Sequence, residues 1–239
     1  MPNTDLIKAI LFDKDGTLVD FEATWGAVNQ KAGLLAAGGD VILARDILDR
    51  CGVDPLTGKT RAESPLAIAA ADEIAEAMIA AGSRLTKPAL VDGLHVLFAE
   101  AARQAVPLTD LKALFAGLKS QGLKLGIASS DSAEAVAATI TTLGLEEWID
   151  FQCGYDSGFG PKPEPGMILA FCVAMNLTPN QVAMVGDSTH DLGMGRAARA
   201  GLTIGVLTGT GSRASLEPLA DVLITSIADL TAILSVQSR

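Results

Sequence analysis

The chain has 239 residues, of which 49% are hydrophobic, 19% are charged and only 4% are aromatic, so it can bury a sizeable core built mainly from aliphatic side chains. Its formal charge of −10 disfavours non-specific attraction to nucleic acid or to an anionic membrane surface. Three widely spaced cysteines, no signal-peptide pattern and no apolar run of roughly 20 residues predict a soluble cytoplasmic protein without a disulfide framework or a membrane span.

The first predicted element is a buried strand that begins at Ile7 and delivers two acids at its end. Aliphatic and aromatic residues fill the run up to Phe12, and Asp13 and Asp15 follow, two residues apart. Two ionised carboxylates this close repel each other unless a cation lies between them or one carries a proton. A strand followed by an ordinary aspartate-rich turn is the alternative, because Asp-Gly is a common turn dipeptide.

The next segment predicts helices without strands. Apolar residues at helical spacing, capping residues and terminal glycines predict helices over about 21–37, 41–51 and 64–81, followed by a further helix over about 88–104. We therefore expect a small helical unit at 20–85, inserted in a core formed by 1–19 and 86–239.

From residue 109 the pattern alternates regularly between helix and strand. Helices are predicted over 109–121, 132–143, 164–176, 191–200 and about 226–236, and strands over 123–128, 151–153, 181–185, 202–207 and 222–224. This alternation is typical of βαβ units, so the expected fold is α/β, a Rossmann-like parallel sheet with helices on both faces.

Polar residues recur where successive predicted strands end. Open parallel sheets bind ligands at that edge, so we expect four loops to converge there. The residues concerned are Asp13, Asp15, Ser129, Lys162, Asp187 and Asp191. Each of them alone is also typical of a turn, a helix cap or a solvated loop, and only their joint occurrence favours a site.

The residue types in this set suit phosphoryl transfer. Carboxylates bind Mg²⁺, which usually takes one or two of them and completes its shell with water and phosphate oxygens. Serine and lysine can hold an anionic group opposite the metal, one carboxylate can attack phosphorus, and a second can move protons.

In these motifs the chain resembles the haloacid dehalogenase superfamily, and specifically its phosphatases with a helical cap inserted after the first motif. Four motifs carry the resemblance over nearly the whole chain: Asp13-Lys14-Asp15-Gly16-Thr17, Ser129 at a strand end, Lys162-Pro163, and residues 186–191, which read GDSTHD. The closing segment, 197–230, looks most like phosphoglycolate phosphatases.

The resemblance implies roles for these residues. Asp13 would be the nucleophile and Asp15 the general acid and base, with Gly16 and Thr17 completing the motif. Ser129 and Lys162 would bind the phosphoryl group. Mg²⁺ would be held by the Asp13 carboxylate, the Asp15 backbone carbonyl and the Asp187 carboxylate, with Asp191 in support through water or Lys162.

The expected substrate is a small phosphorylated metabolite, and the expected assembly is a monomer or a homodimer. Among the cationic residues of the cap, Lys59 and Arg61 are the first candidates to recognise a carboxylated leaving group, and Arg45 and Arg84 compete with them. Trp25, just beyond the first motif, is a candidate either to line the entrance of the site or to pack the cap, and packing is the default expectation.

Two other functions stay open. One is a phosphomutase of the β-phosphoglucomutase kind on the same scaffold, and the other is a binding protein that keeps the fold without catalysis. An acid at Asp15 argues against a dehalogenase, which needs no proton donor for an alkoxide. Lys14, between the two acids, departs from the usual small apolar or aromatic residue, and its side chain is expected to point away from Asp13.

Overall fold

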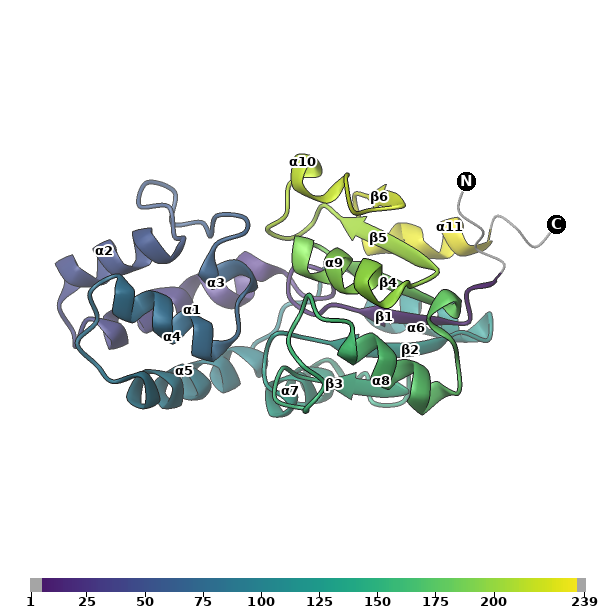
Figure 1. Cartoon of the computed structure of the whole chain (residues 1–239), viewed down its shortest axis with the longest axis horizontal. Helices are drawn as coiled ribbons and strands as arrows, with labels where there is room; N and C mark the ends of the chain where they lie inside the picture. Colours follow the sequence, from purple (N-terminus) through teal and green to yellow (C-terminus); the bar gives the residue numbers. More distant parts are fainter. Residues whose placement is uncertain (1–5, 236–239) are drawn as a thin grey trace.

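A computed structural model describes residues 6–235, so residues 1–5 and 236–239 of the predicted core and the last residue of the predicted closing helix lie outside the described residues. Figure 1 shows two units side by side: a group of helices formed by early residues, and an α/β unit that holds both ends of the chain. The active-site candidates lie where the two units meet.

The α/β unit is built on a six-stranded, entirely parallel sheet, as the helix and strand alternation predicts. The strand order is β3-β2-β1-β4-β5-β6, with the first strand near the centre. The strands are β1 (Ala9–Phe12), β2 (Lys124–Ala128), β3 (Phe151–Cys153), β4 (Val182–Gly186), β5 (Leu202–Val206) and β6 (Val222–Ile224). In register, Phe12 at the end of β1 pairs with Ile127 of β2 and with Val185 of β4.

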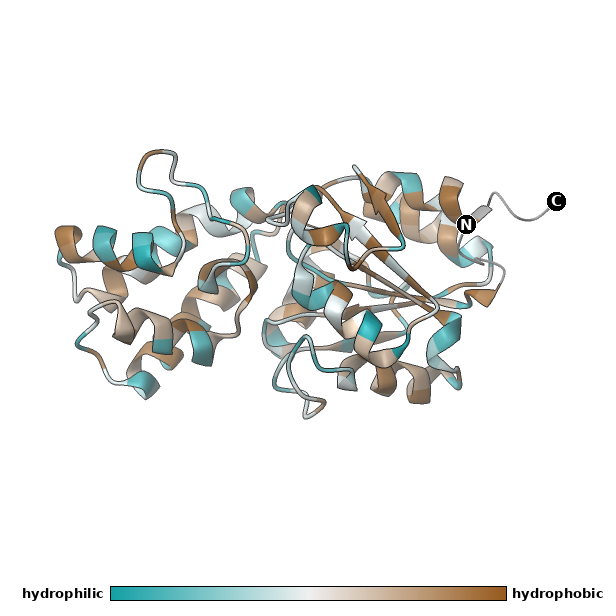
Figure 2. Cartoon of the chain, turned by 45° about the horizontal axis from the view of Figure 1, so that its top comes forward, coloured by the Kyte–Doolittle hydropathy of each residue, from teal (hydrophilic) through white to brown (hydrophobic). Residues whose placement is uncertain are grey.

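Helices cover both faces of the sheet, and the side chains of β1 point alternately toward the two faces. Ile10 and Phe12 pack in a core with the helices of one face, while Ala9 and Leu11 pack in a second core on the other face. The first face carries α6 (Leu111–Ser120), α7 (Ala133–Leu143), η3 (Ile227–Asp229) and α11 (Leu230–Ser235), and the second carries α8 (Gly166–Met175) and α9 (Thr189–Ala198). Figure 2 shows hydrophobic colour concentrated on the strands between these layers.

Short helical turns complete this unit. They are η2 (Pro179–Gln181), which precedes β4, and α10 (Arg213–Leu216), which lies between β5 and β6. Helix α9 begins at Thr189, two residues before the predicted start, because the Ser188 side chain caps it by accepting a hydrogen bond from Asp191 N–H.

The helical unit consists of five helices around its own apolar core. They are α1 (Phe21–Ala36), α2 (Val41–Cys51), α3 (Pro65–Ile68), α4 (Ala71–Ala80) and α5 (Lys87–Ala102). Asp20 and Asp40 cap α1 and α2 through their carboxylates, and Gly52 ends α2 in the left-handed conformation. These boundaries follow the caps visible in the sequence.

The single helix predicted over 64–81 is wrong, because the segment forms two helices separated by an extended step. Ala69 and Ala70 have ψ angles of 158° and 165°, and the Glu73 carboxylate accepts a hydrogen bond from Ala70 N–H to begin α4. Alanine has the highest helix propensity, so the sequence carries no local signal for this break. Tertiary structure imposes it, and it places the backbone of 67–69 beside the site.

Helix α5 packs its apolar face with the helical unit. Leu90, Leu94 and Phe98 belong to the same core as Trp25 and Ile74. The predicted division at residue 85 stays a prediction, and because of this packing we propose that the cap extends to the end of α5.

Two antiparallel linkers join the cap to the core. Asp20 N–H donates to the carbonyl of Val106 at 2.7 Å, and Leu108 N–H donates to the carbonyl of Leu18 at 3.0 Å. The chain therefore leaves the core and returns to it at one place, immediately after the two acids of β1.

Candidate active site

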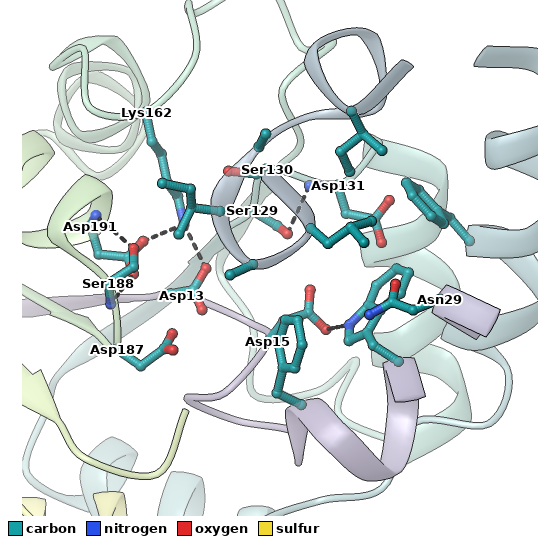
Figure 3. A pocket seen from close by; sticks show the side chains of 18 residues that line it. Asp13, Asp15, Asn29, Ser129, Ser130, Asp131, Lys162, Asp187, Ser188 and Asp191 are labelled. Carbon is teal, nitrogen blue, oxygen red and sulfur yellow. Dashed lines mark hydrogen bonds and ion pairs between the residues drawn. The ribbon is translucent and has the colours of Figure 1, made fainter. Parts of the chain in front are cut away.

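Four of the predicted residues meet in one buried cluster at the carboxyl edge of the sheet. Lys162 Nζ donates to Asp13 Oδ1 at 2.6 Å and to Asp191 Oδ1 at 2.7 Å, and its side chain is only 1% exposed. Asp187 lies in the same cluster, with ligand atoms of Asp13, Asp187 and Asp191 all within 4.8 Å of one another. Figure 3 shows Lys162 reaching between Asp13 and Asp191, with Asp187 below them.

The local sequence fixes these side chains. Asp13 follows β1 directly, and its N–H donates to the carbonyl of Val185, so the neighbouring strand β4 holds its backbone. Asp187 follows β4, and Asp191 lies in the first turn of α9, where Ser188 N–H and Ser188 Oγ donate to Asp191 Oδ2. Rigid strand ends and a helix start therefore carry the three carboxylates.

The electrostatics of the cluster favour a bound cation. Burial and the Asp191 carboxylate raise the pKa of Asp13 to about 7, although Lys162 acts in the opposite direction. Burial, Asp13 and Asp191 also raise the pKa of Asp187 well above its usual range. Burial alone would lower the pKa of Lys162, but the two carboxylates bonded to it raise it, so this lysine stays charged. One ammonium group does not balance three buried carboxylates.

A hard divalent cation fits this donor set. Carboxylate oxygens are the ligands that Mg²⁺ prefers, and a 2+ charge would relieve the repulsion that raises the pKa values of Asp13 and Asp187. The side chains that could hold a metal are those of Asp13, Asp187 and Asp191. Asp191 was expected only in support of the metal site, and that role stays a prediction; in the structure its Oδ1 accepts a hydrogen bond from Lys162 Nζ.

Backbone close to Asp187 explains why glycine follows the two acids of β1. Gly16 has a φ of +83°, and a Cβ there would lie 2.6 Å from Asp187 Oδ2. Gly209 comes closer still, since a Cβ there would lie 1.9 Å from the same oxygen. Thr210 N–H donates to Asp187 Oδ2 at 2.8 Å, so the turn that contains Gly209 and Thr210 orients an acid of the site.

The remaining predicted residues of the first two motifs lie around this cluster. Ser129 is 1% exposed, and its Oγ accepts a hydrogen bond from Asp131 N–H at 3.0 Å. Thr17 is fully buried, and its Oγ1 has no hydrogen-bond partner among the described residues. Gly16 presents its carbonyl to Thr208 Oγ1 at 2.7 Å.

Asp15 lies apart from the buried cluster, on the side of the cap. Trp25 Nε1 donates to Asp15 Oδ1 at 2.7 Å, and Lys14 Nζ contacts Asp15 Oδ2 at 2.6 Å. In the view of Figure 3, Asp15 lies between Asp13 and Asn29 of the cap. Trp25 therefore both packs the cap, edge-on to Phe98, and orients an acid of the site.

Lys14 is buried, with 1% exposure, and pairs with acids other than the first one. Besides Asp15, it contacts Asp131 Oδ2 at 3.4 Å, and its Nζ lies 5.4 Å from the centroid of the Trp25 ring. Burial alone would lower the pKa of Lys14, but these carboxylates raise it. The departure from the usual residue at this position therefore introduces a buried cation that links the first motif to Asp131, a residue not predicted for the site.

A pocket opens from these groups toward the cap and encloses about 600 Å³, part of which is open to solvent. Its floor carries the acids, Lys162 and the polar residues of 129–131 and 188. Its other wall comes from α1, the α3 to α4 segment and α5, with the lining residues Phe21, Trp25, Asn29, Leu66, Ala67, Ile68, Ala69, Ile74 and Phe98. The expected cap cations Lys59, Arg61, Arg45 and Arg84 do not line this pocket.

Two further contacts connect cap and core beside the pocket. His95 Nε2 of α5 hydrogen-bonds with Tyr155 Oη of the core at 2.8 Å, and Thr189 Oγ1 at the start of α9 hydrogen-bonds with the Glu63 carboxylate of the cap.

No helix among residues 6–235 is both long enough and apolar enough to cross a bilayer.

Comparison with known proteins gives consistent matches. Residues 7–199 match the family model of haloacid dehalogenase-like hydrolases. A phosphoglycolate phosphatase of Photorhabdus laumondii is 27% identical over 241 residues, covering 97% of this chain and 94% of that protein.

Solved structures share the fold. The crystal structure of a hydrolase from Pseudomonas syringae has a TM-score of 0.73 at 18% identity and covers 96% of this chain and 98% of that one. A haloacid dehalogenase family hydrolase from Deinococcus radiodurans, with bound phosphate and sodium, has a TM-score of 0.67 at 22% identity, with coverages of 96% and 95%.

Proposed function

Because the chain belongs to the haloacid dehalogenase-like hydrolases, we propose that it is a Mg²⁺-dependent phosphatase that hydrolyses a phosphomonoester of a small metabolite through an aspartyl-phosphate on Asp13. The observation that carries the proposal is the buried cluster of Asp13, Lys162, Asp187 and Asp191 at the floor of a pocket large enough for a small ester. The chain also resembles a phosphoglycolate phosphatase over almost its whole length, which supports phosphomonoester hydrolysis as the reaction class.

In the first step, a carboxylate oxygen of Asp13 attacks phosphorus, and the bond from phosphorus to the alcohol oxygen breaks. Lys162 lies 2.6 Å from Asp13 Oδ1 and supplies positive charge beside the transferring group, and Ser129 is the candidate to bind a phosphoryl oxygen. Asp15, which lies on the cap side of Asp13, is the candidate to give a proton to the departing alcohol.

In the second step, a water molecule attacks phosphorus of the aspartyl-phosphate. Asp15, now ionised, takes a proton from this water, so that inorganic phosphate leaves and the carboxylate of Asp13 is restored. Trp25 and Lys14 hold the two oxygens of Asp15 and thereby keep it at the border between the buried cluster and the leaving-group side of the pocket.

Mg²⁺, when bound, would neutralise charge on the phosphoryl oxygens and on the attacking carboxylate. The residues proposed to hold it are Asp13 and Asp187 through their carboxylates and Asp15 through its backbone carbonyl, with Asp191 in support. The expected cytoplasmic location and the oligomeric state, monomer or homodimer, stay predictions.

The test is release of inorganic phosphate from a panel of small phosphomonoesters with and without Mg²⁺. The variant Asp13→Asn is expected to lose activity completely, because an amide cannot serve as the nucleophile. Asp92→Asn makes the same isosteric change at an exposed position of α5, outside the pocket, and is expected to keep wild-type activity. Wild-type turnover by the Asp13 variant would refute the nucleophile assignment.

The same assay separates hydrolysis from the phosphomutase alternative. A mutase would be rephosphorylated by a hexose bisphosphate and would isomerise a hexose phosphate faster than it releases phosphate. We expect the opposite ratio, since of the residues that line the pocket from the cap only Asn29 is polar, whereas a sugar phosphate carries several hydroxyls that need partners.

A further inference from the structure

The wall of the pocket that faces the leaving group is apolar. Of the residues that the cap contributes to the pocket, Asn29 is polar, and its side-chain nitrogen already donates to Thr60 Oγ1 at 3.1 Å. The others are aromatic, aliphatic or alanine, including Trp25, Ile74 and Phe98. A charged group placed against this wall would lose its hydration without gaining a partner.

The cationic residues of the cap that the sequence analysis considered do not line the pocket. Arg61 donates to the Asp49 carboxylate and to the carbonyls of Asp49 and Val53, and it does not line the pocket. Lys59, Arg45 and Arg84 are exposed and do not line it either. Among the residues that line the pocket, Lys162 is the one cation, and it pairs with Asp13 and Asp191, which are both acids of the buried cluster.

The floor of the pocket next to this wall is acidic. Asp131 lines the pocket, is 8% exposed, and its Oδ2 accepts no hydrogen bond, with Lys14 Nζ 3.4 Å away. Asp15 stands beside it, and Lys14, which contacts both acids, does not line the pocket. A carboxylate or a second phosphate on the leaving group would therefore meet like charges in surroundings of low polarity, where repulsion is strong.

From the apolar wall and the acids beside it, we infer that the enzyme acts on phosphomonoesters whose leaving group is an uncharged and largely apolar or aromatic alcohol. This inference rests on the proposed phosphatase function and narrows it. The leaving group lies against Trp25, Phe98 and Ile74, and carboxylated esters such as phosphoglycolate are poor substrates, although the chain as a whole resembles phosphoglycolate phosphatases.

Two matched pairs of esters test the inference. 4-Carbamoylbenzyl phosphate is compared with 4-carboxybenzyl phosphate, and the phosphate ester of glycolamide is compared with phosphoglycolate, so that each pair differs in charge with little change in size. We expect kcat/KM to be at least about 10-fold higher for the uncharged member of each pair, because a charge buried without a partner costs more than the roughly 1.4 kcal/mol that corresponds to a factor of ten.

Equal or higher kcat/KM for the carboxylated members would overturn the inference while leaving the phosphatase function in place. Absence of phosphate release from all four esters and from the wider panel would instead overturn the phosphatase function, and this inference with it. The two failures are therefore distinguishable in one assay.

A charge placed in the wall provides the second test. Ile68 is half-buried and lines the pocket, so Ile68→Arg adds a cation where the leaving group lies. We expect this variant to raise kcat/KM for the carboxylated esters and to shrink the ratio within each pair by about 10-fold. Ile42→Arg adds the same charge to the cap at a position 78% exposed and outside the pocket, and is expected to leave the ratio unchanged. An unchanged ratio in Ile68→Arg would contradict the placement of the leaving group.

Discussion

Replacing Lys14 with methionine is expected to destabilise the folded protein strongly. The ammonium group is 1% exposed and lies 2.6 Å from Asp15 Oδ2 and 3.4 Å from Asp131 Oδ2. Methionine preserves most of the volume but leaves two acids without their shared cation, and removing one partner of a buried ion pair costs roughly 3–5 kcal/mol. Asp15 keeps its hydrogen bond from Trp25 and is 17% exposed, so the lower end, about 3 kcal/mol, applies.

The measurement is thermal unfolding followed by circular dichroism at pH 7. For a chain of this size each kcal/mol shifts Tm by about 2–4 °C, so the Lys14→Met variant should melt about 6–12 °C below the wild type. Lys8→Met removes the same charge from an exposed position and should shift Tm by less than about 2 °C. In the double variant with Asp131→Asn, at least about 1 kcal/mol of the loss should be recovered, because one of the unpaired acids is then gone. A Tm of Lys14→Met equal to that of Lys8→Met would refute the reasoning.

Three further predictions concern the metal, the turn and the edge of the sheet. Added Mg²⁺ should raise Tm, with about 2.7 kcal/mol of stabilisation at 100 times its Kd, and Asp187→Asn should abolish most of this shift in a thermal denaturation assay. Gly209→Ala should reduce phosphate release by at least about 10-fold, because its Cβ would lie 1.9 Å from Asp187 Oδ2; wild-type activity would show that the turn can move at no cost. Partial burial of Asp150 would raise its pKa, but hydrogen bonds from Lys119 Nζ, Leu125 N–H and Lys124 Nζ outweigh it and lower the pKa. The resulting stability is present above the unfolded pKa of about 3.9 and is lost as pH falls through the lower native pKa, so Asp150→Asn should cost about 1 kcal/mol in urea unfolding at pH 7 and progressively less as the pH falls below the unfolded pKa.

The sequence predicts the α/β core well because each of its strands and helices is indicated by the residues of the element itself and of its flanking loops. Continuous apolar runs followed by polar loops identify β1, β2 and β4, and the same runs explain why acids, Ser129 and Lys162 gather at one edge, since parallel strands all end there. The contacts of Lys162 with Asp13 and Asp191 follow from this topology rather than from any single residue.

What could not be predicted depends on contacts between distant segments. The break between α3 and α4 falls in a run of alanines, where helix propensity points the other way. The pairing of Lys14 with Asp131, and the hydrogen bond from Trp25 to Asp15, bring together residues separated by 117 and 10 positions respectively in a way that no local pattern indicates. The hydrogen bond from Thr210 N–H to Asp187 is of the same kind, although the small residues around it are a signal of close backbone approach.

The paired linkers at 18–20 and 106–108 have a consequence for how such an enzyme diversifies. Because the chain leaves and re-joins the core at one point, the sheet tolerates the whole cap as it would a single surface loop. The wall proposed to contact the alcohol can then be replaced as one segment, between Val19 and Pro107, while the acids and the lysine proposed to bind and transfer the phosphoryl group keep their places. The proposed recognition of the alcohol and the proposed phosphoryl chemistry thus lie on different stretches of the chain, connected by the hydrogen bond from Trp25 of the cap to Asp15.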